Sequence, residues 1–426
     1  MRCMAPPRKL GGSSTRGSEA ICAGGLRYVK RRGLMYRTSR KGTVPSLPRR
    51  WRGITIVVTL CLFVLAACTA PQPKGEVMVY VATPLSGWQA DGGQTVVGGV
   101  RLMAERLNAA GGLLGYKVKV VAIDDEADSD VAVQVAEEIR AAVQAGEKII
   151  GIVGHYNSGQ SLAAMEIYKD LSLVVVTPTA SDVSLTQKGY TNFFRVNATD
   201  AAQGPVDARF LVQGLGARRI ALVHADNEYG RGLRDQMVAA LKGLGVDPAV
   251  VIEIPEGAPT QAKAVQQIKS VQPDAVFLAG YETEGYILLP ELREAGVTVP
   301  FMASDGCFLY EFIDGTGPAA EGVYVSGITP DPKLTTDAKW WKEYQDLEAR
   351  NPGTYSIAGY SAMEVIAEGV KKAGGFNAAR VADAIRNLDF QSLVGHISYN
   401  AIGDLEEQRV YIFQVKDGDF VQVTAE

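Results

Sequence analysis

Short apolar runs alternate along the chain with longer segments in which apolar residues recur every three or four positions. The runs have the length of β-strands and lie at residues 77–82, 118–123, 149–153, 173–176, 220–223, 250–254, 275–279 and 323–325. The longer segments predict amphipathic helices, such as one with Val96, Val100 and Leu107 on a single face. Strands that are apolar throughout belong to parallel sheets covered on both faces. The pattern therefore predicts an α/β fold with doubly wound parallel sheets.

The pattern changes after about residue 334. Helices are expected at Thr335–Ala349, Ile357–Ala373 and Ala378–Leu388, followed by strands at 395–399 and 409–415 that look antiparallel. An α/β chain that ends in this way is expected to re-enter an earlier lobe. The 426 residues are too many for one ordinary core and leave room for two lobes of about 100 to 200 residues each.

The beginning of the chain differs from the rest in charge and hydropathy. Residues 1–50 hold 13 Lys and Arg against one acid, and residues 54–67 are apolar apart from two threonines. A basic segment followed by a short apolar segment is typical of a secretion signal. The apolar segment ends in Leu65-Ala66-Ala67-Cys68, which resembles the lipobox of bacterial lipoproteins. That resemblance implies cleavage before Cys68 and acylation of its thiol.

We therefore expect a signal peptide at residues 1–67 and a lipid-anchored tether at residues 68–75. The protein would then be exported and held at the outer face of the bacterial cytoplasmic membrane by lipid alone. An uncleaved membrane anchor is the alternative, although the apolar run is short for a span. The basic stretch before Met35 is long for a signal peptide, so translation from Met35 is an alternative to translation from Met1.

Removal of the leader makes the chain strongly acidic. Residues 1–67 contain 14 of the 43 Lys and Arg but only one of the 47 Asp and Glu, which leaves 29 bases, 46 acids and a net charge of −17. A folded body with this charge is not expected to bind nucleic acid or anionic lipid. Cys307 is the only cysteine after residue 68. We expect it to be an inert, partly buried thiol rather than part of a disulfide framework.

Side chains suited to binding a small molecule follow several predicted strands, where ligands bind in parallel sheets. They are Ser158, Thr179 and Ser181 in the first half and Tyr229, Tyr281 and Asp305 in the second half. Hydroxyl groups at a helix N-terminus suit a carboxylate, and an acid opposite them suits an ammonium. Together these residues predict a clamp for a zwitterion. Each also has an ordinary explanation: a serine N-cap, tyrosine packing or an Asp-Gly turn.

A series of short motifs occurs along the chain in an order that is more informative than any one of them alone. They are Pro84-Leu85-Ser86-Gly87, Asn108-Ala109-Ala110-Gly111-Gly112, Asp124-Asp125, Thr177-Pro178, Arg195, Asp200 with Gln203-Gly204-Pro205, Tyr229-Gly230, Gly280-Tyr281 and Ser304-Asp305-Gly306. In this order they resemble the leucine/isoleucine/valine-binding protein family of periplasmic receptors. The resemblance covers residues 76–426. It implies the periplasmic binding protein type 1 fold, with two lobes joined by a three-segment hinge.

By this resemblance the first lobe comprises residues 76–199 and 329–404, and the second comprises residues 200–328 and 405–426. The implied function is that of a monomeric substrate-binding protein of an ABC importer. Such a protein captures an amino acid or a similar molecule by lobe closure and delivers it to a membrane permease, without a cofactor or metal. A ligand-sensing lipoprotein, or a receptor for urea, short amides or aromatic acids, is the alternative.

The resemblance also assigns roles to individual residues. The family holds the ligand α-carboxylate with a serine that matches Ser158 and a threonine that matches Ser181. It holds the α-ammonium with a backbone carbonyl that matches Thr179 and a glutamate that matches Asp305. Two tyrosines that close over the ligand from the second lobe are matched by Tyr229 and Tyr281.

The sequence departs from the family pattern in three places. An aromatic residue of the side-chain pocket aligns with Gly92, and Trp88 is a new bulky neighbour that we add to the predicted site. The ligand side chain is therefore not expected to be leucine-like. Asp305 is one methylene shorter than the family glutamate but keeps its charge. The family's two disulfide cysteines align with Ala127 and Asn157, so both are absent together.

An enzyme is the competing class of function, and the sequence offers it little. It contains no G-x-S-x-G elbow, no P-loop, no complete G-x-G-x-x-G after a strand and no H-E-x-x-H. The three histidines, His155, His224 and His396, are too scattered to indicate a metal site and are expected to be structural. We therefore expect no catalysis.

Overall fold

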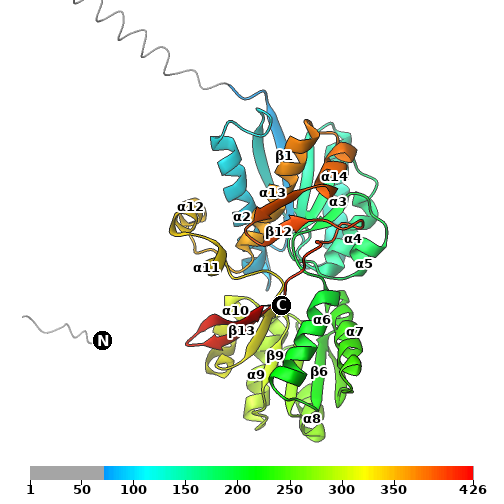
Figure 1. Cartoon of the computed structure of the whole chain (residues 1–426), viewed down its shortest axis with the longest axis vertical. Helices are drawn as coiled ribbons and strands as arrows, with labels where there is room; N and C mark the ends of the chain where they lie inside the picture. The colour runs from blue at the N-terminus through cyan, green and yellow to red at the C-terminus, as the bar shows by residue number, and fades with distance from the viewer. Residues whose placement is uncertain (1–71, 426) are drawn as a thin grey trace, which may run out of the picture. The chain divides into compact units, whose positions relative to one another are not determined.

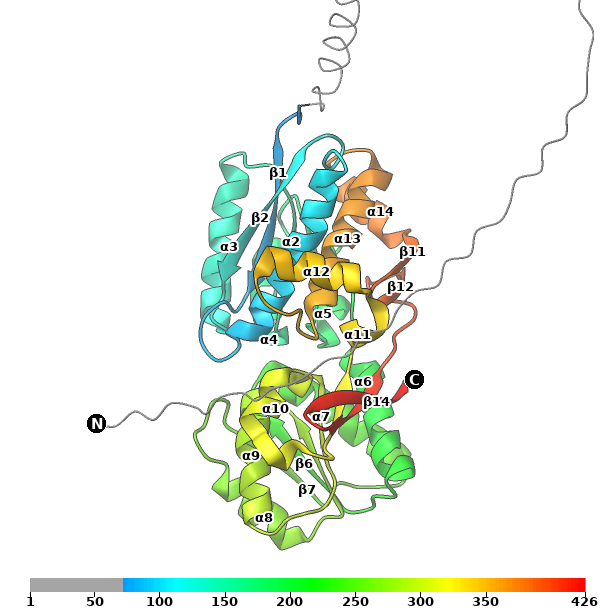
Figure 2. The same ribbon diagram turned by 90° about the vertical axis from the view of Figure 1, so that its left-hand side faces the viewer.

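The computed structural model describes residues 72–425, so the predicted signal peptide and Cys68 lie outside the described residues. Within the described part, the chain forms two α/β lobes, each built around its own sheet (Figure 1). A view turned by 90° shows helices covering the sheets (Figure 2). The predicted fold class is confirmed.

The sheet of the first lobe has five parallel strands in the order β2-β1-β3-β4-β5. They are β1 (Glu76–Thr83), β2 (Lys117–Asp124), β3 (Ile149–Gly154), β4 (Val174–Thr177) and β5 (Phe193–Arg195). Every residue of β3 and β4 is buried. This burial on both faces is the reason that these strands appear in the sequence as continuous apolar runs.

The helices between these strands are α2 (Ala90–Ala109), α3 (Ser129–Gln144), α4 (Ser158–Tyr168) and α5 (Ser184–Gln187). The predicted apolar face of α2 is buried, since Val96 and Val100 are fully inaccessible and Leu107 is 6% exposed. The helix α3 begins where Asp128 accepts hydrogen bonds from the amides of Asp130 and Val131. The apolar stripes thus hold the helices against the sheet.

The segment after residue 329 packs on the first lobe. It contains α11 (Pro332–Thr335), α12 (Ala338–Glu348), α13 (Ser356–Ala373), α14 (Ala378–Arg386), β11 (Asp389–Ser392) and β12 (Gly395–Ser398). The helix α13 lies against α2 in one core, and a Cβ on Gly99 would stand only 1.9 Å from the Ser356 carbonyl oxygen. The helix predicted at 335–349 is α12. It begins three residues later than predicted, because the Asp337 side chain accepts a hydrogen bond from the Trp340 amide and caps the helix at that point.

The sheet of the second lobe has seven strands in the order β7-β6-β8-β9-β10-β13-β14. They are β6 (Ile220–Ala225), β7 (Val250–Ile254), β8 (Ala275–Ala279), β9 (Phe301–Ala303), β10 (Tyr324–Gly327), β13 (Tyr411–Lys416) and β14 (Asp419–Ala425). The first five are parallel, and β13 and β14 are antiparallel. Helices of this lobe are α6 (Asp200–Arg209), α7 (Glu228–Gly243), α8 (Ala262–Val271), α9 (Glu282–Glu294) and α10 (Tyr310–Thr316).

The chain passes between the two sheets three times: from β5 to α6, from β10 to α11 and from β12 to β13. Hydrogen bonds tie these passages together. The Ala198 amide donates to the Ile328 carbonyl at 3.3 Å, and the amide and hydroxyl of Thr199 both donate to Gln408 Oε1 at 2.8 Å. The three passages therefore form one linked hinge.

Four strands escape the sequence pattern. The strands β5 and β9 have only three residues each, too few to show a period, and β11 and β14 are edge strands with a largely exposed face. Pairing with neighbouring strands determines that all four are strands, with β12 and β13 as the hairpin partners of β11 and β14. One edge of the second sheet is antiparallel, because β13 runs opposite to both β10 and β14.

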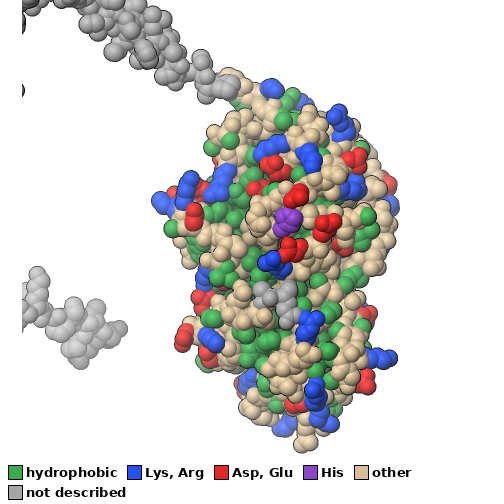
Figure 3. Space-filling view, in the orientation of Figure 1, with side chains coloured by type: hydrophobic (Ala, Val, Ile, Leu, Met, Phe, Trp, Pro, Cys, Tyr) green, Lys and Arg blue, Asp and Glu red, His purple; other side chains and the backbone are tan. Residues whose placement is uncertain are grey.

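The described surface is polar and mixed in charge. Figure 3 shows acidic and basic side chains interspersed over this face of both lobes, without a broad basic patch. None of the helices within residues 72–425 has the length and apolar character needed to cross a membrane. Cys307 is fully buried rather than partly buried as predicted.

Candidate functional site

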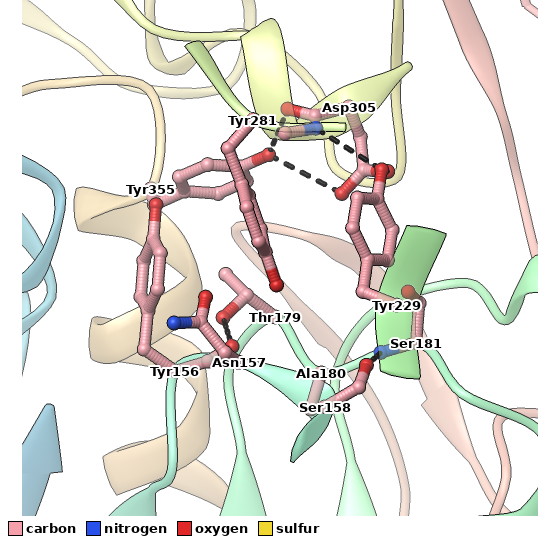
Figure 4. Close-up of a pocket in the computed structure, with 11 residues that line it drawn as sticks. Tyr156, Asn157, Ser158, Thr179, Ala180, Ser181, Tyr229, Tyr281, Asp305 and Tyr355 are labelled. Carbon is pink, nitrogen blue, oxygen red and sulfur yellow. Dashed lines mark hydrogen bonds between the residues drawn. The ribbon is translucent and has the colours of Figure 1, made fainter. Parts of the chain in front are cut away.

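One pocket collects residues from the strand ends of both lobes (Figure 4). The first lobe supplies Tyr156, Asn157, Ser158, Thr179, Ala180 and Ser181. The second lobe supplies Tyr229, Tyr281, Asp305 and Gly306, and Tyr355 comes from the start of α13.

Six of the seven residues predicted for the ligand line this pocket, although they are spread over nearly 150 positions of the sequence. Trp88 is the exception. It is half-buried and packs beside the pocket, with its ring centroid 5.6 Å from that of Tyr281 and the two rings tilted by 55°. Trp88 thus supports a lining residue without lining the pocket itself.

Ser158 is the first residue of α4, directly after β3, and only 1% of it is exposed. The interpretation of Ser158 as a simple N-cap is wrong, because Asn157 occupies that position. Instead, Ser158 Oγ accepts hydrogen bonds from the amides of Ser181 and Asp182, both at 3.3 Å. Its own hydroxyl hydrogen is left to donate elsewhere. The first amides of α4 also have no partner within the helix, so this end of the pocket favours an anion.

Thr179 and Ser181 lie on the loop that follows β4. Thr179 Oγ1 donates to the Tyr156 carbonyl at 2.5 Å, and Asn197 Nδ2 donates to the Thr179 carbonyl at 3.3 Å. A carbonyl oxygen has two lone pairs, so that of Thr179 retains one for a further donor. Ser181 is 1% exposed. The loop therefore presents an acceptor and a hydroxyl group side by side.

The second lobe contributes two stacked tyrosines. The rings of Tyr229, at the start of α7, and Tyr281, just before α9, are 5.0 Å apart with an interplanar angle of 27°. Tyr229 donates from Oη to Asp305 Oδ1 at 2.5 Å. Figure 4 shows the Tyr281 hydroxyl directed into the middle of the pocket. These rings form an aromatic wall facing the hydroxyl groups of the first lobe.

Asp305 opens a helical turn (Asp305–Cys307) directly after β9 and is 5% exposed. Besides Tyr229, it receives a bond from the Tyr355 hydroxyl, which lies 2.6 Å from the Asp305 carbonyl oxygen and 3.5 Å from Oδ2. Burial raises the pKa of the Asp305 carboxyl to about 6, against the opposing effect of the Tyr229 hydrogen bond. Within residues 72–425 it forms no ion pair, so its charge is uncompensated.

Other buried acids in this region have raised pKa values, so their neutral form is favoured. Burial raises the pKa of Asp200 to about 8, and the nearby Asp305 and Asp182 raise it further. Burial also raises the pKa of Glu282 well above its usual value. Arg195, the fully buried cation of this part of the first lobe, is paired with Asp404 at 2.5 Å. The pocket is therefore short of positive charge.

The sequence prediction missed Tyr156, Asn157 and Tyr355. Tyr156 and Asn157 belong to the segment that follows β3, so their place at a strand end was an available signal. Asn157 donates to Gln89 Oε1 at 2.6 Å. Tyr355 follows no strand and comes from the returning segment, so only the three-dimensional packing shows its contact with Asp305.

A metal site finds no support in the described part of the chain, where no group of His, Cys, Asp and Glu is arranged to hold an ion. The histidines have separate structural contacts. His155 is buried between Asp125, 2.7 Å from Nδ1, and Tyr168, 3.1 Å from Nε2. Neither His224 nor His396 lines the pocket.

Comparison with known proteins identifies the family. Residues 76–419 match the sequence profile of a family described as periplasmic binding protein. The chain belongs to this family. The match spans the first sheet, the returning segment and the second sheet apart from β14, and it confirms the resemblance predicted from the ordered motifs.

Three of the proteins that the chain resembles are named for the amino acids that they bind. An amino acid binding protein of Pseudomonas aeruginosa is 29% identical over 346 residues, covering 80% of this chain and 91% of the relative. A leucine-, isoleucine-, valine-, threonine-, and alanine-binding protein of the same species is 29% identical, covering 78% and 87%. The crystal structure of a leucine-binding protein from Thermotoga maritima is 26% identical with a TM-score of 0.74, covering 82% of this chain and 98% of that protein.

Proposed function

We propose that this protein is the substrate-binding component of an ABC importer and that it captures an α-amino acid, or a similar zwitterion, between its lobes. One observation carries the proposal. A buried, uncompensated carboxylate, Asp305, stands across a single pocket from the hydroxyl groups at the start of α4. A ligand with an ammonium and a carboxylate group would pair with both ends at once.

The names of the relatives agree with this ligand class. The two from Pseudomonas aeruginosa are called binding proteins for amino acids. In this protein, Ser158 and Ser181 would hold the ligand carboxylate, and Asp305 with the Thr179 carbonyl would hold its ammonium. Tyr229 and Tyr281 would cover the ligand from the second lobe. Because the two lobes each supply part of the contacts, the ligand would bind the closed form more tightly and shift the population toward it.

A thermal-shift screen of the protein beginning at residue 72 tests the ligand class. A ligand present at 100 times its Kd adds about 2.7 kcal/mol to the free energy of unfolding. Amino acids are expected to raise the melting temperature. Urea, short amides and aromatic acids lack the ammonium that Asp305 would pair with, and they are expected to leave it unchanged. Stabilisation by these compounds and by no amino acid would refute the proposed clamp.

Transport and sensing differ in what happens after binding. We propose transport, with a permease as the partner. Uptake of the labelled ligand by cells that carry the cognate permease should require this protein. Normal uptake after its deletion, with loss of a transcriptional or motility response to the ligand, would favour sensing.

Attachment by lipid at Cys68 is a second part of the proposal, based on the Leu65-Ala66-Ala67-Cys68 sequence after an apolar run. Acyl chains contribute about 0.8 kcal/mol per buried CH₂ group, so several chains suffice for stable attachment. The substitution Cys68→Ser should abolish acylation and release the protein from the membrane fraction. Membrane attachment and processing that are unchanged in this variant would contradict the proposal.

Catalysis is not part of the proposed function. Cys307 is fully buried, and burial raises the pKa of its thiol well above the usual value, so the reactive thiolate is disfavoured. Hydroxyl groups and a carboxylate bonded to tyrosines line the pocket, as suits recognition of a ligand.

A further inference from the structure

Tyr156 stands at the end of the pocket that the proposed clamp leaves open. It is 5% exposed and lines the pocket, yet its hydroxyl group has no hydrogen-bond partner among residues 72–425. The hydroxyl groups of Tyr229 and Tyr355 both bond to Asp305. Buried tyrosine hydroxyl groups usually have a partner, so that of Tyr156 is available to a ligand.

The position of the Tyr156 ring indicates which part of the ligand it would meet. Figure 4 shows the ring along one side of the pocket, beside Tyr355, with Ser158, Ser181 and Tyr229 on the other side. A ligand with its carboxylate and ammonium at the clamp would extend its side chain toward Tyr156. This step rests on the proposed function, because the clamp sets the orientation.

The Tyr156 ring also limits the size of that side chain. A Cβ on Gly92 would lie 2.7 Å from Tyr156 Oη and 3.7 Å from Leu309 Cδ1, so the hydroxyl group reaches the backbone of α2. Tyr156 thus occupies the space over Gly92. Its ring is also fixed edge-on against that of Tyr355, with centroids 5.8 Å apart.

The titratable side chains around Tyr156 are acids. Burial raises the pKa of the phenol well above its usual value, and the carboxylates of Glu282, Glu311, Asp305 and Asp91 raise it further. Tyr156 therefore stays protonated and neutral. Glu282 is 3% exposed, and its Oε2 has no hydrogen-bond partner within the described part. The nearby cation Arg350 already bonds to Asp91 at 2.5 Å. An acidic ligand side chain would be buried here without a compensating cation, which disfavours its ionised form.

We propose that Tyr156 sets the ligand specificity of the pocket. It selects α-amino acids whose short side chain carries a neutral or cationic hydrogen-bond donor. It rejects aliphatic side chains such as those of valine and leucine, because they leave its hydroxyl group unpaired, and the longer leucine side chain also exceeds the space beside its ring. It also rejects acidic side chains.

Calorimetry with matched ligands tests this selection. Threonine and valine have nearly the same shape but differ in one hydroxyl group. Asparagine and leucine differ in that only asparagine carries an amide. Asparagine and aspartate differ in charge. We expect the threonine-to-valine and asparagine-to-leucine affinity ratios to lie between about 5 and 100. Aspartate is expected to bind more weakly than asparagine by a similar factor.

Two variants separate the hydroxyl group from the ring. Tyr156→Phe keeps the ring and should reduce the preference for threonine over valine to within about threefold, mainly by weakening threonine binding. Tyr156→Leu removes the bulk and should improve leucine binding about tenfold or more. Tyr116→Phe removes a hydroxyl group of the first lobe outside the pocket and serves as the matched control.

The outcomes distinguish this inference from the proposed function. Glycine and alanine present the clamp groups with little side chain, so their binding tests the clamp alone. If glycine and alanine bind, and valine and leucine bind as tightly as threonine and asparagine, the selection by Tyr156 is refuted while the clamp is supported. An unchanged threonine preference in Tyr156→Phe also refutes it. If no amino acid binds to the wild type, both fail together.

Discussion

Asp305→Asn is expected to weaken amino-acid binding and to stabilise the ligand-free protein at the same time. Asparagine has nearly the shape of aspartate and retains an oxygen that accepts from Tyr229, whose Oη is 2.5 Å from Asp305 Oδ1. The variant therefore removes charge without leaving a cavity. Loss of one partner of a buried ion pair costs about 3 to 5 kcal/mol. At about 1.4 kcal/mol per factor of ten, the Kd should rise by two to three orders of magnitude or more.

The effect on stability has the opposite sign. Burial raises the pKa of Asp305 from 3.8 to about 6, which means that the folded state disfavours the ionised carboxyl by about 3 kcal/mol. For an acid whose pKa is raised by folding, this cost appears as the pH rises from 3.8 through 6 and is complete above 6. At pH 7 the neutral asparagine avoids this cost of burying an ionised carboxyl in the folded state. The variant should therefore unfold at a higher temperature than the wild type when no ligand is present.

Calorimetry with the best amino acid and thermal unfolding without ligand measure the two effects. Asp314→Asn makes the same substitution at an exposed position on α10 and should change neither. A variant that loses both affinity and stability would indicate structural damage rather than removal of a counter-ion. A rise in Kd of less than about threefold would exclude Asp305 from the ammonium site and favour an uncharged ligand.

Three further predictions follow from the same structure. Because the pKa of Asp305 is raised to about 6, protonation should make ammonium binding about tenfold weaker at pH 5 than at pH 8. Calorimetry on Asp305→Asn should show an affinity that does not change with pH. If the affinity of this variant still falls at low pH, another group is responsible for the pH dependence. Saturating ligand should reduce the radius of gyration in small-angle scattering by favouring lobe closure; an unchanged radius would argue against it. Gly99→Ala places a methyl group 1.9 Å from the Ser356 carbonyl oxygen and should cost about 1 to 3 kcal/mol in denaturant unfolding. Gly243→Ala, at a helical position with no atom within 4 Å of its added Cβ, is the matched control and should leave stability unchanged or raise it by up to about 1 kcal/mol. Equal stability of the two variants would contradict the close packing.

The sequence by itself determined the parts that depend on local periodicity. Continuous apolar strands such as β3 are buried on both faces, and the 3.6-residue stripe of α2 faces the core. Because both patterns arise from which faces are buried, they predict the parallel α/β architecture without a structure. The strand-end rule also selected Ser158, Ser181, Tyr229 and Asp305 from remote parts of the chain, and all four line one pocket.

Only the tertiary structure decided how these residues meet. The sequence predicts that Ser158 begins a helix. The two amides that donate hydrogen bonds to its hydroxyl oxygen, however, belong to the loop after the next strand. Tyr355 is 50 positions from Asp305 and reaches its carbonyl oxygen only because the chain returns to the first lobe. The strands β5 and β9 are too short to have a period and exist through their neighbours in the sheets.

The electrostatic character of the pocket also belongs to the tertiary structure. The sequence gives Asp305 a negative charge, but the rise in its pKa comes from burial by segments of both lobes. Likewise, nothing adjacent to Tyr156 in the sequence indicates that its hydroxyl group lies over Gly92, 64 positions earlier. Burial, dielectric environment and hydrogen-bond partners are properties of groups brought together from distant parts of the chain, so local patterns cannot encode them.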